Sequence, residues 1–362
     1  MSAAAAFRAE FPVFDHLSYL NAGTEGPVPR RAVEAIHRRL ELEATGGRGG
    51  KPYFEGLKEL ATEVRARYAR VLGCDASEVA LTGSTTDGVN TVISGLRLGQ
   101  GDEVLTTDEE HPGLLAPLGR ARRRSGISIR VVPFAEIAGE VRPTTRLIAC
   151  SHVSWVSGQV MDTDALASHG VPVLLDAAQA IGAVPVDVRT LGCDFYAASG
   201  QKWLCGPEGS GCLYVRPDRL EEVTIPWPGF GSLADPHAPL EFEPAEGAAR
   251  LDHGFPSGMR STWTLASLDV FEGAGWEWAH ERAASLAASL AASLAERGLR
   301  VGPRGRSTLV SWNVEDADAE VARLAGEGFV VRSIPAFDLV RASVGAWSSE
   351  EELERLVALA AG

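Results

Sequence analysis

Lys202 stands in the glycine-flanked stretch SGQKWLCG (199–206), directly after the apolar, strand-like run DFYAA (194–198). A lysine held in apolar surroundings has a lowered pKa, which makes its free amine available for Schiff-base formation and proton transfer. Asp176 ends a second apolar run, VPVLLD (171–176), so we expect it at the carboxyl end of a strand, where open α/β sheets bind ligands. A carboxylate there requires a cationic partner or several donors, although a helix-capping aspartate fits the same pattern.

Hydroxyl side chains cluster upstream of these residues, in the stretch LTGSTTDGVN (81–90). Ser84, Thr85 and Thr86 lead from a strand-like run into a helix with apolar periodicity. Hydroxyls and free backbone N–H groups at a helix N-terminus form an anion site, although an ordinary N-cap without a ligand also explains this stretch. An imine-forming lysine, an aspartate able to hold a proton on a pyridine nitrogen and a phosphate-binding turn together suit pyridoxal phosphate (PLP).

Alternating helices and short strands must position these residues. Runs rich in Val, Ile and Leu occupy 78–83, 103–107, 127–134, 146–154 and 171–178, with helical patterns between several of them. Nearly continuous apolar strands separated by helices predict an α/β fold whose mainly parallel sheet is covered on both faces.

The sequence changes in character near residue 250. A stretch rich in Pro, Gly and Glu is followed by a long Ala/Leu helix at 275–298, and the tail predicts a compact βαββα unit that includes a strand at 329–334. We therefore expect an N-terminal arm at 1–20, a large PLP-binding domain at 21–250 and a small C-terminal domain at 251–362.

Composition argues against several classes of protein. The net charge is −14 and no basic cluster is longer than RARRRS near residue 120, so we expect no nucleic-acid partner. No run of about 18 apolar residues and no basic leader is present, which predicts no membrane span or signal peptide and a cytoplasmic protein. The five cysteines lack close C-x-x-C spacing and are expected to be reduced and packed. The histidines show no ligand-like pairing, so we predict no metal.

Five stretches resemble, in the same order, the class V branch of the fold-type I PLP-dependent enzymes. They are TGSTTDGVN, EEHPG, SHVSWVSG, LLDAAQ and SGQKWLCGPEGSGCLYV, within a resemblance that spans about residues 15–355. This branch includes cysteine desulfurases, cystine C–S lyases and proteins similar to isopenicillin N epimerase. The resemblance implies a large domain with a mainly parallel seven-stranded sheet, a small α+β C-terminal domain, a small amino-acid substrate and a homodimer with shared active sites.

The resemblance also implies roles for the matching residues. Lys202 would form the Schiff base with PLP, Asp176 would pair with its pyridine nitrogen, and His111 would stack on its ring; these three are the expected catalytic residues. Gln179 would bond the phenolic oxygen of the cofactor. The expected phosphate ligands are Ser84, Thr85, Thr86, Ser199 and Gln201, together with Ser261 or Thr262 reaching across a dimer interface to the phosphate of the other subunit.

The substrate side of the expected site depends on two arginines. The resemblance implies that Arg341 binds the substrate carboxylate, and Arg332, nine residues earlier, supplies a second guanidinium in a pattern similar to the cystine-lyase subgroup. Gln201 stands where desulfurases of this branch commonly have histidine, and Trp155 stands where an asparagine is often found. We expect Trp155 and His152 to shape the substrate pocket, although a structural histidine and a core tryptophan are the alternatives.

The stretch between the two arginines, SIPAFDLV (333–340), contains no cysteine. A desulfurase places its nucleophilic thiol in a longer loop there, so we discount that activity, and the short turn around Cys205 is expected to bury that thiol. We therefore expect β-elimination by a PLP-dependent C–S lyase acting on cysteine, cystine or an S-substituted cysteine. An amino-acid epimerase, an aminotransferase and a catalytically inactive PLP-binding subunit are the alternatives on the same scaffold.

Overall fold

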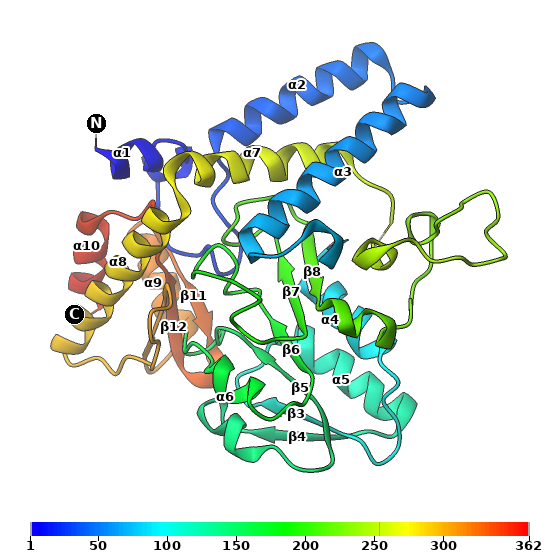
Figure 1. Ribbon diagram of the computed structural model, residues 1–362. Helices are drawn as coiled ribbons and strands as arrows, with labels where there is room; N and C mark the ends of the chain where they lie inside the picture. Colours follow the sequence, from blue (N-terminus) through cyan, green and yellow to red (C-terminus); the bar gives the residue numbers. More distant parts are fainter. Residues whose placement is uncertain (1, 253, 361–362) are drawn as a thin grey trace.

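The computed structural model describes residues 2–252 and 254–360 and is built around a seven-stranded sheet (Figure 1). The strands are β2 (Val79–Thr82), β3 (Glu103–Thr107), β4 (Ser128–Val132), β5 (Thr145–Ser151), β6 (Val173–Asp176), β7 (Phe195–Ser199) and β8 (Gly211–Val215). Their order across the sheet is β2-β8-β7-β6-β5-β3-β4; β8 is antiparallel to both neighbours, and the other pairs are parallel. The predicted α/β fold with a mainly parallel sheet is confirmed.

Helices cover both faces of this sheet. They include α3 (Gly50–Leu72), α4 (Thr85–Gly95), α5 (Pro112–Ser125) and α6 (Thr163–Ala167). Side chains alternate along each strand, so Leu174 and Ala197 pack with the apolar residues of α4 and α5, whereas Leu175 and Tyr196 pack with those of α3. Burial on both faces explains why the strands read as nearly continuous apolar runs.

A three-stranded antiparallel sheet forms a smaller unit beside the large sheet, coloured orange to red in Figure 1. Its strands are β9 (Leu309–Asn313), β11 (Arg332–Ile334) and β12 (Leu339–Ser343), in the order β11-β12-β9. Around it pack α8 (Trp276–Glu296), α9 (Ala317–Gly326) and α10 (Glu350–Ala360).

The strand predicted at 329–334 is divided in the structure. β10 (Phe329–Val330) pairs in parallel with β1 (Ser18–Tyr19) of the N-terminal arm, and only the following β11 pairs with β12. The chain turns between these two partners, so no continuous strand forms. The N-terminal arm is thereby tied to the small unit.

The N-terminal arm and α7 determine where the two units meet. The arm begins with α1 (Ala3–Arg8), whose Arg8 forms a 2.9 Å ion pair with Glu352 of α10, so the two terminal helices lie on the same side of the molecule (Figure 1). α7 (Gly258–Ala274) packs along α2 (Arg30–Gly46) and α3, whereas α8 packs on β9 and α10. α7 therefore belongs by packing to the large unit, and the domain boundary expected near residue 250 stays a prediction.

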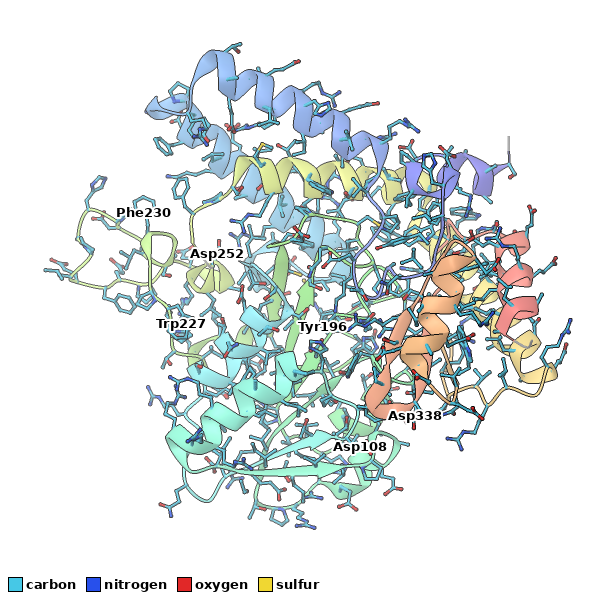
Figure 2. The ribbon with its side chains drawn as sticks, turned by 180° about the vertical axis from the view of Figure 1, so that it is seen from behind. Asp108, Tyr196, Trp227, Phe230, Asp252 and Asp338 are labelled. Carbon is cyan, nitrogen blue, oxygen red and sulfur yellow. The ribbon has the colours of Figure 1, made fainter. Side chains whose placement is uncertain are left out.

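The remaining elements are short. The 3₁₀ helices are Pro12–Asp15, Ala76–Glu78, Phe134–Glu140, Pro217–Glu222, Phe230–Ser232, Gly247–Leu251 and Pro335–Phe337. Between β8 and α7 a loop extends away from the body of the molecule, and Figure 2 shows Trp227 and Phe230 on it. These two side chains are 59% and 58% exposed.

Two further predictions concern hydrophobic segments and thiols. None of the helices within the described residues combines the length and the apolar character that crossing a membrane requires. All five cysteines are free thiols; Cys74 is half-buried, and the other four are buried.

Candidate active site

A cavity of about 250 Å³ lies where the carboxyl ends of the large-sheet strands meet the small sheet. The predicted site residues that line it are Ser84, Thr85, Thr86, His111, Trp155, Asp176, Gln179, Ser199, Gln201, Lys202, Arg332 and Arg341. These residues come from segments more than 250 positions apart in the chain. The fold therefore gathers most of the chemistry-bearing residues in one place.

Lys202 reaches this cavity because two neighbouring parallel strands end there. β6 ends at Asp176, which lies opposite Ala197 of β7, and the lysine turn follows the end of β7 directly. Burial lowers the pKa of Lys202, and the charge of Asp176 opposes this shift. The sequence contains two other lysines, Lys51 and Lys58, and both are exposed on α3. Lys202 is thus the one primary amine of a side chain available for chemistry in this cavity.

Asp176 is a buried carboxyl group whose charged form is stabilised by few neighbouring groups. Its Oδ1 accepts a hydrogen bond from the backbone N–H of Ala178 at 3.0 Å. Burial raises the pKa of Asp176, and the backbone bond and the nearby Lys202 oppose the rise. A buried carboxylate is stabilised by a cationic partner, and a protonated ring nitrogen of a ligand would be one.

The N-terminus of α4 supplies hydroxyl and amide donors. Ser84 is the N-cap, and its Oγ accepts from the N–H of Asp87 at 3.1 Å. Thr85 Oγ1 and Ser199 Oγ are buried and have no hydrogen-bond partner among the described residues. Unsatisfied buried hydroxyls are costly, so this arrangement favours an anion at the helix N-terminus.

His111 and Gln179 are each held in place by neighbouring groups. The Nδ1 atom of His111 accepts from the N–H of Gly113 at 3.0 Å, and its ring lies edge-on to Trp155 with centroids 5.2 Å apart. The Gln179 side chain donates to the carbonyl of Gly23 at 2.7 Å and accepts from Trp203 Nε1 at 3.0 Å. An amide has two N–H donors, so Gln179 keeps one for a ligand.

The two arginines are cross-strand neighbours. Arg332 of β11 lies directly opposite Arg341 of β12, and like charges in that position repel each other. Arg341 is 2% exposed, donates to the carbonyl of Trp155 and has no acidic partner within the described part of the chain. Burial lowers the pKa of Arg341 to about 9, and Arg332 adds to this shift. A ligand carboxylate between the two guanidinium groups would offset their mutual repulsion and the cost of burying the charge of Arg341.

A loop after β5 fixes the carbonyl that Arg341 uses. Glu109 accepts hydrogen bonds from Ser154 and from Ser157, the latter at 2.6 Å. Because these bonds close the loop around Trp155, they hold its carbonyl toward Arg341 and its ring against the cavity.

His152 does not line this cavity, contrary to our expectation. His152 directly follows β5, and its Nδ1 lies 2.9 Å from the hydroxyl of Tyr196, which packs with the apolar residues of α3. Figure 2 shows Tyr196 in the middle of the molecule. His152 lines a separate cavity of about 400 Å³ together with His280, and burial lowers its pKa to about 4, so the ring is neutral.

Thr262 also lies outside the cavity of its own chain. It is on α7, and the neighbouring Ser261 and Thr264 line a different cavity of about 230 Å³. Its role at the phosphate of a partner subunit stays a prediction.

The sequence analysis missed three lining residues of the N-terminal segment, Gly23, Thr24 and Glu25. Their signal in the sequence was the glycine- and proline-rich stretch NAGTEGPVP at 21–29. A Cβ at Gly23 would lie 2.9 Å from Arg341 Nη2 and from Gln179 Oε1, so glycine allows this segment to pass close to both.

No thiol lines the cavity. Cys205, three residues after Lys202, is buried, and burial raises its pKa well above the ordinary value. Within residues 2–252 and 254–360, no group of three His, Cys, Asp or Glu side chains is arranged to hold a metal ion; His253 lies outside the described residues.

These features fit PLP. The unpartnered hydroxyls of Thr85, at the start of α4, and of Ser199, at the end of β7, suit its phosphate. Buried Asp176 suits its ring nitrogen, and Lys202 suits its aldehyde. Burying each of these polar groups without a bound partner costs free energy.

Solved structures similar to this chain include two of the protein C-DES. One is a lysine-to-alanine variant with glycine covalently linked to the PLP cofactor; it has a TM-score of 0.91 and 29% identity and covers 98% of both chains. The other is a complex of the cystine C–S lyase C-DES with its reaction product cysteine persulfide; it has a TM-score of 0.90 and 29% identity and covers 97% of this chain and 99% of that one. Fold and site together define a PLP-dependent enzyme of fold type I.

The chain belongs to the aminotransferase class-V family, whose profile matches residues 18–356. A cysteine desulfurase of Klebsiella pneumoniae (strain 342) is 30% identical, over 97% of this chain and 96% of its own length. Isopenicillin N epimerase of Streptomyces clavuligerus is 29% identical, over 93% of this chain and 92% of its own length. The chain thus spans nearly the full length of both relatives.

Proposed function

We propose that this protein is a PLP-dependent C–S lyase that acts on cysteine, cystine or an S-substituted cysteine by β-elimination. The products are a thiol or persulfide and 2-aminoacrylate, which hydrolyses to pyruvate and ammonia. The observation that carries the proposal is a cavity that joins Lys202 to paired arginines and contains no thiol. The similarity to the cystine C–S lyase C-DES over nearly the whole chain supports it.

The residues of the cavity have distinct tasks in this reaction. Arg341 and Arg332 bind the substrate carboxylate and so orient the bonds at Cα. When bound, PLP would supply an aldehyde that can hold the substrate amine and a ring that can accept electron density from Cα. The Nζ atom of Lys202, freed by the substrate amine, removes the Cα proton, since burial keeps its pKa below the ordinary value for lysine.

A desulfurase requires a thiolate that attacks the substrate sulfur. The connection from β11 to β12 is the short 3₁₀ turn Pro335–Phe337 followed by Asp338, which leaves no room for a longer loop with a nucleophile. We infer that sulfur leaves as a small-molecule product and is not transferred to the protein.

Epimerisation is the second candidate, because the similarity to isopenicillin N epimerase covers almost the whole chain. Removal of the Cα proton by Lys202 would be common to both reactions. Return of a proton to the opposite face of Cα would invert the configuration and leave the C–S bond intact. An aminotransferase would place the proton on the cofactor instead.

One assay separates these outcomes. The PLP-loaded protein is incubated with L-cystine and a panel of S-substituted L-cysteines, and pyruvate, thiol and the D-enantiomer are measured. Pyruvate with equimolar thiol or persulfide is the result expected for the lyase. Formation of the D-enantiomer without pyruvate would establish the epimerase and refute the lyase.

We also propose a homodimer with shared active sites. Thr262 does not reach the cavity of its own chain, and the loop that carries Trp227 and Phe230 exposes large aromatic side chains. Light scattering should give twice the mass of the 38.4 kDa chain. A monomeric holoenzyme with full activity would refute the proposal.

A further inference from the structure

Glu25 belongs to an N-terminal segment, residues 21–26, that lies between the small sheet and the lysine turn. At one end of the segment, Gly23 N–H donates to Ser343 Oγ of β12 at 3.1 Å. At the other end, Gly26 N–H donates to the carbonyl of Gln201 at 2.7 Å, and a Cβ at Gly26 would lie 2.0 Å from the carbonyl oxygen of Lys202. Glu25 is therefore fixed beside the lysine, and its side chain lines the same cavity.

The backbone around Glu25 is rigidly held while its carboxyl group is free. Its N–H donates to the carbonyl of Asn21 at 3.2 Å, and its own carbonyl accepts from the Tyr19 hydroxyl at 2.9 Å. Within the part of the chain that the structure describes, no hydrogen bond or ion pair engages the carboxyl group of Glu25. A half-buried carboxyl that is free on the cavity side is available to a ligand.

The contacts of Gly26 with Gln201 and Lys202 place the adjacent Glu25 at the lysine end of the cavity. Burial and the nearby Glu208 raise the pKa of the Glu25 carboxyl, and Lys202 partly offsets the rise. Burial and, to a smaller extent, the charge of Glu25 raise the pKa of the Tyr19 hydroxyl. At a given pH, Glu25 therefore carries a proton more often than an exposed glutamate does. In the proposed function the arginines bind the substrate carboxylate, and Lys202 and Glu25 line the same cavity. We therefore expect the bonds that change to face Lys202 and Glu25.

We propose that Glu25 is the general acid that protonates the sulfur of the leaving group as the C–S bond breaks. This inference rests on the proposed lyase function. Lys202 Nζ takes the Cα proton, the Cα–H electron pair becomes the second Cα–Cβ bond, and the Cβ–S pair goes to sulfur. The sulfur takes the proton of the Glu25 carboxyl and leaves as a thiol. The resulting Lys202 ammonium and Glu25 carboxylate are neighbours, so a proton returning from Lys202 to Glu25 restores both groups.

This role has a consequence for the substrate range. An acidic thiol or a persulfide departs readily as an anion and gains little from an acid, whereas a weakly acidic alkyl thiol departs poorly unless it is protonated. Glu25 therefore extends the reaction to S-alkyl cysteines, which are the substrates with the poorest leaving groups in the proposed class.

The experiment compares Glu25→Gln with the wild-type holoenzyme on L-cysteines that carry S-methyl, S-ethyl, S-phenyl and S-(2-nitrophenyl) groups. The amide keeps the shape of the side chain but does not donate an acidic proton. We expect kcat/KM for the S-alkyl substrates to fall by about a hundredfold or more. For the S-(2-nitrophenyl) substrate, kcat/KM should stay close to the wild-type value. The rate of the variant should therefore depend more steeply on the pKa of the departing thiol than the rate of the wild type does.

Glu208→Gln is the matched control, because Glu208 is exposed and outside the cavity but interacts electrostatically with Glu25. It should leave the dependence on leaving-group acidity unchanged. The absorbance of bound PLP and the melting temperature should be equal in wild type and Glu25→Gln, which excludes a loss of folding or cofactor.

Each remaining outcome is decisive. If Glu25→Gln lowers the rate equally for all four substrates, or for none, Glu25 is not the acid, while thiol release by the wild type still upholds the lyase. If the wild type releases no thiol from any of them, the proposed function fails and this inference fails with it.

Discussion

The two ends of the active-site cavity are constructed in different ways. At the lysine end, Asp176 and Lys202 follow β6 and β7, which are adjacent parallel strands of one sheet. At the arginine end, Arg341 depends on the β11–β12 hairpin, on the loop that carries Trp155 and on the N-terminal segment at Gly23. The lysine end thus requires neighbouring strands of one sheet, and the arginine end requires three segments that are distant in the chain.

This difference in construction matches the proposed tasks, which are bond changes at the lysine end and substrate recognition at the arginine end. At the lysine end, burial lowers the pKa of Lys202 and raises the pKa of Asp176. Both shifts favour the neutral form of the group. The arginine end holds positive charge that has no acidic partner among the described residues. Changes at the lysine end should therefore alter kcat, and changes at the arginine end should alter KM.

Lys202→Ala should have the largest effect, since it removes the amine that we propose binds the cofactor and moves the Cα proton. We expect no detectable pyruvate or thiol release. Borohydride treatment of the PLP-loaded wild type should label Lys202 alone among the three lysines, and Lys58→Ala serves as the control on an exposed lysine. Normal turnover by Lys202→Ala, or label on another lysine, would remove Lys202 from its assigned role.

Asp176→Asn should have the next largest effect, because the neutral amide does not hold a proton on the ring nitrogen. We expect kcat to fall at least about a hundredfold, or about 2.7 kcal/mol in activation free energy. The absorbance spectrum of the bound cofactor should change as well. A variant with the wild-type kcat and spectrum would contradict the pairing of Asp176 with the ring.

Arg341→Ala tests the other end of the cavity. Loss of a charged hydrogen bond costs about 1.5 to 3 kcal/mol, so KM should rise at least about tenfold. The cofactor spectrum should be unaffected. Arg332→Ala should raise KM less, because Arg332 is exposed whereas Arg341 is buried. An unchanged KM in Arg341→Ala would remove this residue from the carboxylate site.

His152→Gln should leave kcat and KM nearly unchanged, because His152 does not line the active-site cavity. Burial lowers the pKa of His152 from 6.5 to about 4, so below pH 6.5 the unfolded chain binds a proton that the folded chain does not. This difference lowers the free energy of unfolding as the pH falls from 6.5 toward 4, by up to about 3 kcal/mol.

Denaturant unfolding at about pH 7.5 and about pH 4.5 tests this linkage. The variant lacks the titrating imidazole, so it should lose less stability than the wild type between the two values. An equal loss in both proteins would show that His152 does not contribute, and a large change in KM would show that it reaches the substrate.

The lysine end of the cavity could be predicted from the sequence more fully than the arginine end. Asp176 and Lys202 each end an apolar run, and the carboxyl ends of adjacent parallel strands necessarily meet at one edge of a sheet. The resemblance to the cystine-lyase subgroup implied the pairing of Arg332 with Arg341, and the hairpin register places them directly opposite each other. The repulsion between the two guanidinium groups could be inferred only once the register of the hairpin was known.

The errors have physical causes as well. His152 was placed at the substrate because it follows a strand near the site, but its ring contacts the hydroxyl of Tyr196, which packs with the apolar residues of α3. Glu25 was missed because its stretch, NAGTEGPVP, carries no periodic pattern. Its position depends on bonds to Ser343 and Gln201, which no local signal predicts.

The sequence by itself determined the α/β class, the carboxyl-edge positions of Asp176 and Lys202 and the hydroxyl-rich start of α4, because these follow from short-range patterns of apolar, glycine and hydroxyl residues. Only the tertiary structure decided which side chains share the cavity, where the two units meet and which buried charges lack partners. Those features depend on contacts between segments far apart in the chain, and such contacts leave no periodic trace in the sequence.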